Sequence, residues 1–438
     1  MPSGLPTAPN DRVGFRPPPV GSGPNLGAPR KGPRPSPTIP LTPGEETIDY
    51  NPVLLVLIGY LQKVSPTGLD EAVASALKKI PSFMHMLNIT DAASFLTFAN
   101  DLLRWIPSET YEGKDIVEIL CMFYFIFDQS PLLELQTPIK PESVGEPLTW
   151  LSSWLVVYAQ LIGSWMDTPG SFTADSLQSF INSPQYNVGE ALVPPGGWRT
   201  FNEFFARHLQ LGARPVTEPD NDYVIVYPAD CKYDSTPEDQ GSVSVSDVGT
   251  VVIKGLSWTI NSLLQGSEFG NDFNGGVWMH AFLSAYNYHR QHAPVAGTVL
   301  EAKIIQGTAY LEVNADGSPQ RRIITSGDKP DAPDTPGYQF LQTRGMIIID
   351  NPVVGKVAVL PIGMAQVSSV NLSVRKGDVV RKGQEISYFK FGGSDIICVF
   401  QKQAGLSPNS FKSSGSGKYA YSKTGTELAR KPEPKPRR

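Results

Sequence analysis

The stretch VRKGDVVRKGQEISYFKFGGSDIICVF (residues 374–400) decides the fold of the C-terminal half of the chain. Its β-branched and aromatic residues come in short runs, and Lys-Gly pairs at 376–377 and 382–383 stand between them. Such runs are typical of strands, and glycine between them is typical of tight turns. The earlier stretch APVAGTVLEAKI (residues 293–304) has the same rhythm. Together they predict a compact, barrel-like sheet of the kind found in lipoyl and biotinyl carriers.

The same pattern of short strands and turns extends back to Tyr223, through runs such as YVIVYP, TVVIKG, GMIIID and VGKVAVLPI. We therefore expect a β-rich domain over residues 195–403. Residues 46–194 instead show helical periodicity, and Thr90 and Thr173 stand before amphipathic stretches as helix N-caps would. The predicted fold class is α+β, a helical N-terminal domain followed by the β-rich domain.

Both ends of the chain have the composition of segments that bury little apolar surface. Residues 1–45 are rich in Pro and Gly, and residues 404–438 contain SSGSGK and KPEPKPRR. Such segments cannot offset the entropy lost on ordering. The sequence therefore predicts a disordered start and a flexible tail.

Composition limits the location and partners of the protein. The formal net charge of −5 lacks the basic surplus of a nucleic-acid-binding protein, so nucleic acid is not expected as a partner. The three cysteines, Cys121, Cys231 and Cys398, show no C-x-x-C spacing, which predicts neither a zinc site nor a disulfide framework. The start of the chain does not resemble a signal peptide. These features favour a reducing, cytoplasmic location.

The uncharged stretch LTWLSSWLVVYAQLIGSWM (residues 148–166) could be a membrane segment by composition. Its Thr, Ser, Gln and Gly residues recur at helical spacing and form a weakly polar stripe. We therefore favour a helix buried among other helices, with contact to a membrane surface as the alternative.

Three short segments carry the residue types of nucleophilic chemistry. YNYHRQHAP contains His289 and His292, YPADCKY contains Asp230 at the end of a predicted strand, and FKFGGSDI contains Ser394 after two glycines. Taken singly, each is explained as well by packing or by a turn. Taken together, a serine, a histidine base and an orienting acid are the parts that activate a hydroxyl nucleophile. The G-x-S-x-G elbow of common hydrolases is missing, since a predicted strand follows Ser394.

Residues 196–401 resemble the phosphatidylserine decarboxylase family. FNEFFARHLQLGARPV (residues 201–216) matches the F-F-x-R and G-A-R-P opening motif of the family, and VIKGLSWTINSLLQ (residues 252–265) matches its Lys-Gly strand and following helix. YHRQHAP matches the Y-H-R-x-H-x-P motif, and FKFGGS matches the Gly-Ser self-cleavage site. The helical region is similar to the soluble fungal branch that contains L-tryptophan decarboxylase.

The resemblance implies a self-processing enzyme. Ser394 would attack the carbonyl of Gly393, and elimination from the resulting ester would leave dehydroalanine. Loss of ammonia from the dehydroalanine would then give a pyruvoyl group at the new N-terminus. His292 would be the general base, Asp230 would hold its imidazole, and His289 would act later, near the substrate carboxylate or as a proton donor. The pyruvoyl group, derived from Ser394, would be the only cofactor and would act as an electron sink, with no metal. The two cleavage fragments would stay together.

The sequence departs from the family pattern at four positions. Asp395 follows the serine where Thr or Ser is usual, and Cys231 follows Asp230 where Gly is common. Asn287 stands where the membrane enzymes carry Asp, and His280 has no counterpart in the family motifs.

The expected substrate is a free amino acid, with an aromatic one as the first candidate. A membrane-acting phosphatidylserine decarboxylase that makes phosphatidylethanolamine is the main alternative, which a spanning helix or a polybasic patch would favour. A non-catalytic, lipoyl-like interaction module would need a lysine in a Met-Lys-Met or Asp-Lys-Ala context, and neither occurs. A family member that no longer cleaves is disfavoured by the intact set of Gly393, Ser394, His292 and Asp230.

Overall fold

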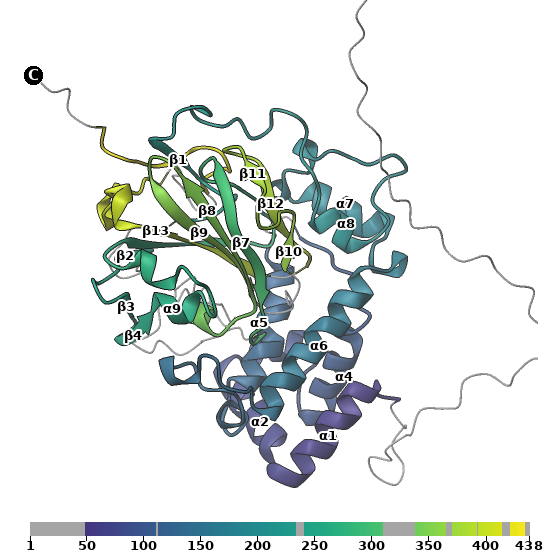
Figure 1. Ribbon diagram of the computed structural model, residues 1–438. Coiled ribbons are helices and arrows are strands. Elements are labelled where there is room, and N and C mark those ends of the chain that lie inside the picture. The colour runs from purple at the N-terminus through teal and green to yellow at the C-terminus, as the bar shows by residue number, and fades with distance from the viewer. Residues whose placement is uncertain are drawn as a thin grey trace, which may run out of the picture. The chain divides into compact units, whose positions relative to one another are not determined.

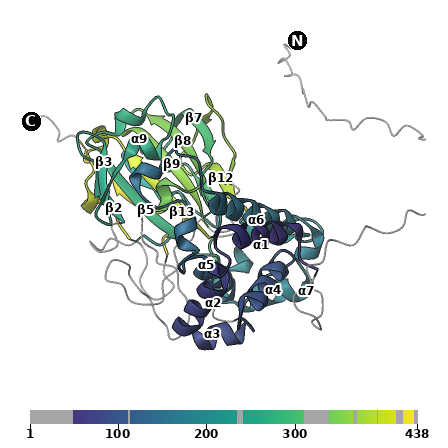
Figure 2. The ribbon, with the colours of Figure 1, turned by 90° about the horizontal axis from the view of Figure 1, so that it is seen from below.

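A computed structural model describes residues 49–110, 113–233, 241–309, 338–364, 370–391, 393–413 and 421–433. Residues Tyr50–Arg438 form one compact unit. Helices fill its first part and strands its second, which confirms the predicted α+β class (Figures 1 and 2). The predicted disordered segment 1–45 lies outside the described residues. The boundary between residues 194 and 195 stays a prediction.

The helical part follows the predicted periodicity. Its longer helices are α1 (Pro52–Val64), α2 (Gly68–Lys79), α4 (Ala92–Leu102), α5 (Asp115–Phe127), α6 (Trp150–Met166) and α7 (Ala174–Asn182). Thr173 caps α7, since its side chain accepts a hydrogen bond from the Ser176 amide, as predicted. The cap of α4 is Asp91 and not Thr90, because Asp91 and Ser94 form a reciprocal capping box.

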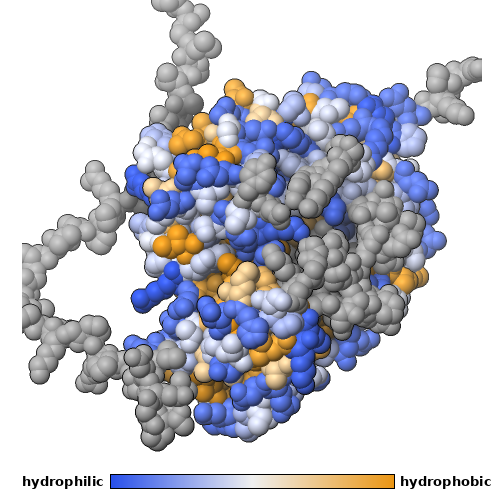
Figure 3. Space-filling model, turned by 180° about the vertical axis from the view of Figure 1, so that it is seen from behind, coloured by the Kyte–Doolittle hydropathy of each residue, from blue (hydrophilic) through white to orange (hydrophobic). Residues whose placement is uncertain are grey.

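Helix α6 is buried along one face only. Trp154 and Tyr158 are buried, and they donate hydrogen bonds to the backbone carbonyls of Val53 and Ala99. Trp150 and Val157 on the other face are exposed. Among the described residues no single helix is long and apolar enough to cross a membrane, although α1 and α2, which meet at 100°, pass that test as a pair. On the face in Figure 3, hydrophobic residues gather on the lower part of the molecule, where the helices lie.

The strands of the second part form antiparallel sheets. The larger sheet has the order β11-β7-β8-β9-β13-β5-β2, and the smaller has the order β10-β12-β6. The bounds in the larger sheet are β2 (Ser242–Ser244), β5 (Val277–Leu283), β7 (Gly297–Ile305), β8 (Arg344–Asn351), β9 (Gly355–Met364), β11 (Val379–Val380) and β13 (Gly393–Phe400). Those in the smaller are β6 (Arg290–His292), β10 (Val370–Leu372) and β12 (Glu385–Phe389).

The two stretches predicted to form a barrel-like sheet lie together, because β11 pairs with β7. Both Lys-Gly pairs form turns, and Gly377 and Gly383 have φ values of 93° and 78°. Glycine adopts this left-handed conformation without a steric penalty, which explains the repeated pattern. A hydrophobic core that includes Trp258 and Trp278 covers one face of the larger sheet.

The prediction of a flexible tail from residue 404 onward is wrong for part of that segment. Strand β14 (Glu427–Arg430) pairs with β1 (Val224–Val226), and Leu428 and Ala429 are fully buried. The Lys- and Pro-rich composition around the strand concealed the short apolar run that pairs with β1.

Candidate active site

Ser394 lies at the start of a central strand. In β13 it stands opposite Leu283 of β5 and Gly363 of β9, so the Gly393–Ser394 peptide bond lies at the first rung of the ladder. The Ser394 side chain is fully buried, and its Oγ has no hydrogen-bond partner among the described residues. Buried hydroxyls are normally hydrogen-bonded, and exceptions often mark functional groups. The Ser394 hydroxyl is therefore shielded from water and has no hydrogen bond to the described residues.

His289 is brought toward the same junction by strand pairing. Its carbonyl accepts a hydrogen bond from the Phe389 amide at 2.9 Å, while Leu283 pairs with Ser394. These two links join the segment before β13 to the segment between β5 and β6. The Phe205 ring packs against both the His289 imidazole and the ring of Phe391, which stands two residues before Gly393.

The His289 imidazole is enclosed by apolar and cationic neighbours. It stacks on the Phe205 ring with centroids 3.9 Å apart, and neither ring nitrogen has a partner in the described part of the chain. Burial lowers the pKa of His289 well below its usual value, and the charge of Arg207 lowers it further. The neutral imidazole is therefore free to exchange a proton.

His292 is held by two hydrogen bonds. Its Nδ1 lies 2.7 Å from the carbonyl oxygen of Gly383, and its Nε2 lies 3.0 Å from the Tyr288 hydroxyl. A carbonyl oxygen can only accept, so Nδ1 carries the proton and Nε2 of the neutral ring accepts from Tyr288. Burial lowers the pKa of His292, which favours this neutral form. The tautomer is the one that a base acting through Nε2 requires.

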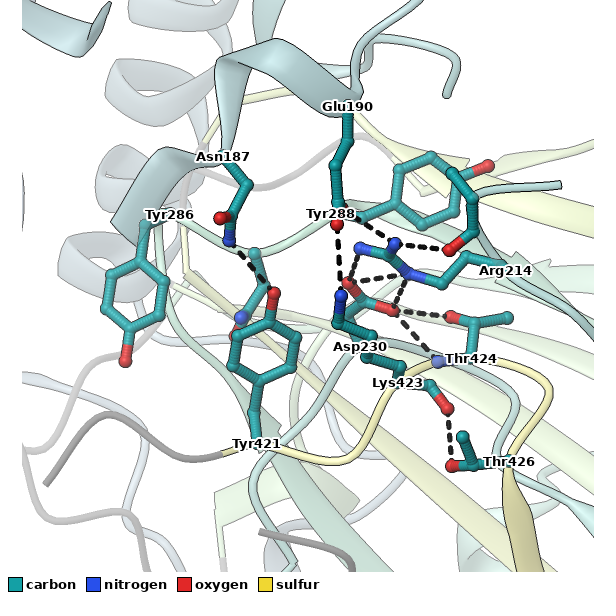
Figure 4. A network of polar contacts seen from close by, with 12 residues as sticks. Asn187, Glu190, Arg214, Asp230, Tyr286, Tyr288, Tyr421, Lys423, Thr424 and Thr426 are labelled. Carbon is teal, nitrogen blue, oxygen red and sulfur yellow. Dashed lines mark hydrogen bonds and ion pairs between the residues drawn. The ribbon is translucent and has the colours of Figure 1, made fainter. Parts of the chain in front are cut away.

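Asp230 does not contact His292, so the predicted hydrogen bond between the two side chains is wrong for this structure. The buried Asp230 carboxylate instead accepts from Arg214 Nε at 2.8 Å, and from the Thr424 amide and hydroxyl at 2.9 Å and 3.0 Å. Figure 4 shows Arg214 between the carboxylates of Asp230 and Glu190. Five donor contacts saturate the carboxylate, because Arg214 Nε also reaches its second oxygen at 3.1 Å and Arg214 Nη2 donates to the same atom.

Asp230 reaches His292 indirectly. The Arg214 guanidinium lies over the Tyr288 ring, 5.9 Å from its centroid, and the Tyr288 hydroxyl bonds to His292 Nε2. A cation over an aromatic face attracts the ring, so Arg214 helps to fix Tyr288. Sequence reasoning missed both linking residues, although Arg214 stands in the G-A-R-P motif and Tyr288 begins the Y-H-R-x-H-x-P motif.

Arg207 is a further residue that sequence reasoning did not place in the site. It follows α8 (Phe201–Phe205) and is buried, and its Nη2 donates to the carbonyls of Tyr186 and Tyr286 at 2.9 Å and 3.2 Å. Its Nε and Nη1 have no partner within the described ranges. No described carboxylate lies at hydrogen-bond distance from the guanidinium, so its positive charge is not neutralised there and lowers the pKa of His289.

A cavity of about 870 Å³ reaches the site at Arg207, whereas Ser394, His289, His292 and Asp230 are not among its lining residues. Its wall includes apolar residues of the loop before α8 and a mixture of charged groups. Among them are Trp198 before α8, Arg207 after α8, Arg290 of β6, Tyr388 of β12 and Lys390 after β12, together with the carboxylates of Asp167 and Glu203. Such a wall suits a ligand with both an apolar and an anionic part. Among the described residues no group of three or more His, Cys, Asp or Glu could hold a metal ion.

Comparison with known protein families agrees with the fold and the site. Residues 201–423 match the family model described as phosphatidylserine decarboxylase. That range contains Ser394, both histidines and Asp230. The chain belongs to the phosphatidylserine decarboxylase family.

Individual relatives agree over the same region. Phosphatidylserine decarboxylase proenzyme 3 of Schizosaccharomyces pombe is 32% identical over 235 residues, which are 54% of this chain and 22% of that protein. Decarboxylase iboD of Amanita muscaria is 30% identical over 247 residues, 54% of this chain and 69% of that protein. The phosphatidylserine decarboxylase proenzyme of Fusobacterium nucleatum is 28% identical over 291 residues, 63% of this chain and 89% of that protein. The chain thus spans about a fifth of the first relative and most of the other two.

The residues at the start of β13 fit a pyruvoyl group made from Ser394. The Oγ of Ser394 has no partner among the described residues. The preceding residue is a glycine, so no Cβ stands beside the Gly393 carbonyl that the hydroxyl would attack. His289 lies on the segment between β5 and β6, and His292 lies in β6; neither is hydrogen-bonded to Ser394. His289 and the residues of β5 and β9 that flank Ser394 would hold the group.

Proposed function

We propose that the protein is a self-processing, pyruvoyl-dependent decarboxylase that removes the α-carboxylate of a free amino acid. The observation that carries this proposal is the buried Ser394 hydroxyl, which lacks a partner among the described residues and directly follows Gly393 at the head of β13. A structural serine in that position would be expected to hydrogen-bond to its surroundings.

Self-cleavage begins with proton transfer from Ser394. As Oγ bonds to the carbonyl carbon of Gly393, the C–N bond to Ser394 breaks and an ester replaces the peptide bond. We propose that His292 accepts the hydroxyl proton at Nε2 and returns a proton to the departing amine nitrogen. In this structure Nε2 bonds to the Tyr288 hydroxyl, and Ser394 Oγ has no partner among the described residues, so Nε2 must exchange Tyr288 for the serine before the proton moves. The Gly383 carbonyl accepts a hydrogen bond from Nδ1 of His292 and so keeps the ring proton on that nitrogen. Asp230 supports this base through Arg214 and Tyr288.

In turnover, the pyruvoyl group supplies a carbonyl that takes up the electron pair released as carbon dioxide leaves. His289 then acts as the proton carrier at the reacting carbon. Its lowered pKa suits that role, because a carrier must release its proton readily, and its ring nitrogens have no partner among the residues that the structure describes. The Phe205 ring fixes the plane of the imidazole and excludes water from one side.

Separate variants test this division of roles. His292→Ala is expected to accumulate full-length precursor, whereas His289→Ala should cleave and yet decarboxylate poorly. Gel analysis of cleavage and carbon dioxide release from the cleaved fraction measure the two steps. Identical behaviour of both variants at both steps would show that the assignment is wrong.

The substrate that we propose is a water-soluble amino acid, with an aromatic side chain as the first candidate. One similar relative, Decarboxylase iboD, has a name that mentions no phospholipid, and this similarity supports a substrate other than a phospholipid. Trp198 and Tyr388 in the cavity wall offer aromatic surfaces to such a side chain. A cytoplasmic location is part of the same proposal, because the three cysteines show no C-x-x-C spacing that would indicate a disulfide framework.

A phosphatidylserine decarboxylase is the second candidate, because several similar relatives carry that name. An apolar groove of about 510 Å³ between α1 and α6, lined by Val56, Trp150 and Leu161, could contact lipid. A panel of free amino acids and phosphatidylserine vesicles, assayed for carbon dioxide with cleaved enzyme, separates the candidates. Turnover of the vesicles without turnover of any free amino acid would establish the second candidate.

A further inference from the structure

Two of the positions at which the sequence departs from the family pattern contact each other. His280 Nε2 lies 3.2 Å from Asp395 Oδ2, and both side chains are almost fully buried. The same oxygen accepts from the Tyr338 hydroxyl at 2.7 Å and from Gln339 Nε2 at 2.8 Å. All three contacts are to Oδ2, and Oδ1 has no hydrogen-bond partner among the described residues. A buried carboxylate is costly without donors, so these contacts form a polar centre in an apolar core.

The Asp395 side chain points away from the reacting serine. Successive residues of a strand project to opposite faces of the sheet, so Asp395 and Ser394 lie on different faces. Asp395 stands opposite Phe282 and Ile362, and His280 stands opposite Ile397. Ile362 and Ile397 belong to the large hydrophobic core. Asp395 therefore cannot touch the substrate and can act only through the position of its own strand.

Self-cleavage creates a specific mechanical problem at this strand. Before cleavage, the chain holds Ser394 from both sides. Afterwards its N-terminal connection is gone, and loss of its nitrogen as ammonia also removes a backbone donor from the first rung of the ladder. Unsecured strand ends fray. Asp395 is then the first residue with a side chain tied to other elements, to β5 through His280 and to the segment 338–340 through Tyr338 and Gln339.

We propose that Asp395, held by His280, Tyr338 and Gln339, is a positioning residue that keeps the newly made end of β13 in register after self-cleavage. The inference rests on the proposed function, since it concerns the cleaved chain. It explains why an acid at position 395 occurs together with a histidine at position 280. The anchor fixes the pyruvoyl carbonyl while leaving the substrate side of the sheet unchanged.

Hydrogen exchange in cleaved and uncleaved proteins tests the anchor. Asp395→Leu replaces both carboxylate oxygens by methyl groups and so removes the acceptor while keeping the branched shape. Asp395→Asn, which retains one acceptor oxygen, is the conservative variant. In a Ser394→Ala background, which stays uncleaved, both variants should protect the amides of residues 395–397 nearly as well as the parent does. In the cleaved protein, Asp395→Leu should speed exchange of these amides by about tenfold or more, and Asp395→Asn by less.

Turnover supplies the second measurement. Cleaved Asp395→Leu is expected to contain a normal amount of pyruvoyl group but to lose about tenfold in kcat with little change in KM, since the reacting group is misplaced and the cavity is not. Equal loosening in the uncleaved background, blocked cleavage in both variants, or cleaved protein that matches wild type would each overturn the anchor. A wild-type chain that never cleaves would instead show that the proposed function is wrong, and intact mass reports that outcome separately.

Discussion

Replacing Asp230 by Asn should destabilise the protein far more than the matched change at Glu190. Both carboxylates bind Arg214, but Asp230 is fully buried whereas the Glu190 side chain is 32% exposed. Breaking a buried ion pair from one side typically costs about 3–5 kcal/mol, because the remaining charge stays buried without its partner. A partly exposed pair contributes about 1 kcal/mol or less. Asp230→Asn should therefore lose about 3 kcal/mol, and Glu190→Gln less than about 1 kcal/mol.

The measurement is unfolding by urea or heat in a Ser394→Ala background, so that every variant remains one chain. In the cleaving background, Asp230→Asn should slow self-cleavage less than His292→Ala does, because Asp230 reaches the histidine only through Arg214 and Tyr288. Equal stability of the two carboxylate variants would refute the reasoning. So would an Asp230→Asn protein of unchanged stability that fails to cleave at all, since a direct hydrogen bond to His292 would then be required.

Three further changes test other parts of the structure. Burial raises the pKa of Glu109 from 4.5 to about 7, so between these pH values the folded state binds a proton that the unfolded state releases. The contribution of the protonated Glu109 to folding stability is therefore fully present below about pH 4.5 and is lost as the pH rises through about 7. Between pH 5 and 8 the wild-type free energy of unfolding should fall by up to about 3 kcal/mol because of Glu109, and Glu109→Gln should abolish this fall. An unchanged dependence of the unfolding free energy on pH would contradict the raised pKa. Leu428→Ala should cost about 2–5 kcal/mol in the same assay if β14 is a core strand, whereas a flexible tail would tolerate it. Gly383→Ala should slow self-cleavage, measured on gels. A Cβ at this residue, whose φ is 78°, would lie 2.3 Å from Val216 Cγ2 and would displace the carbonyl that binds His292. Cleavage at the wild-type rate would show that Gly383 is not part of the site.

The elements that the sequence predicted well are those with strong local signals. Helices with regular apolar spacing, such as α4 and α6, and strands between Lys-Gly turns occur where expected, because periodicity and glycine φ values act over a few residues. The α4 cap was displaced by one residue, since Asp91 competes with its neighbour Thr90 for the same role. Strand β14 was missed because its pairing with β1 is a long-range contact that local composition does not report.

Candidate residues for the site could be named from the sequence, but their contacts could not. Ser394, His289 and His292 could be chosen from short motifs, whereas the partner of Asp230 depends on where Arg214 and Thr424 fold. The pairing of His280 with Asp395 is equally invisible in sequence, because strand register brings the two together from different parts of the chain. Side-chain partners are set by tertiary packing, which a motif does not encode.

The central claim is that Ser394 becomes a pyruvoyl group by cleavage of its own peptide bond, and the intact mass of the purified protein tests it most directly. The wild-type chain should give two fragments, residues 1–393 and 394–438, the shorter one blocked to Edman degradation and reactive toward carbonyl reagents. Ser394→Ala should give a single chain of 438 residues. A wild-type protein that remains one chain, or a Ser394→Ala protein that still splits at this bond, would contradict the account.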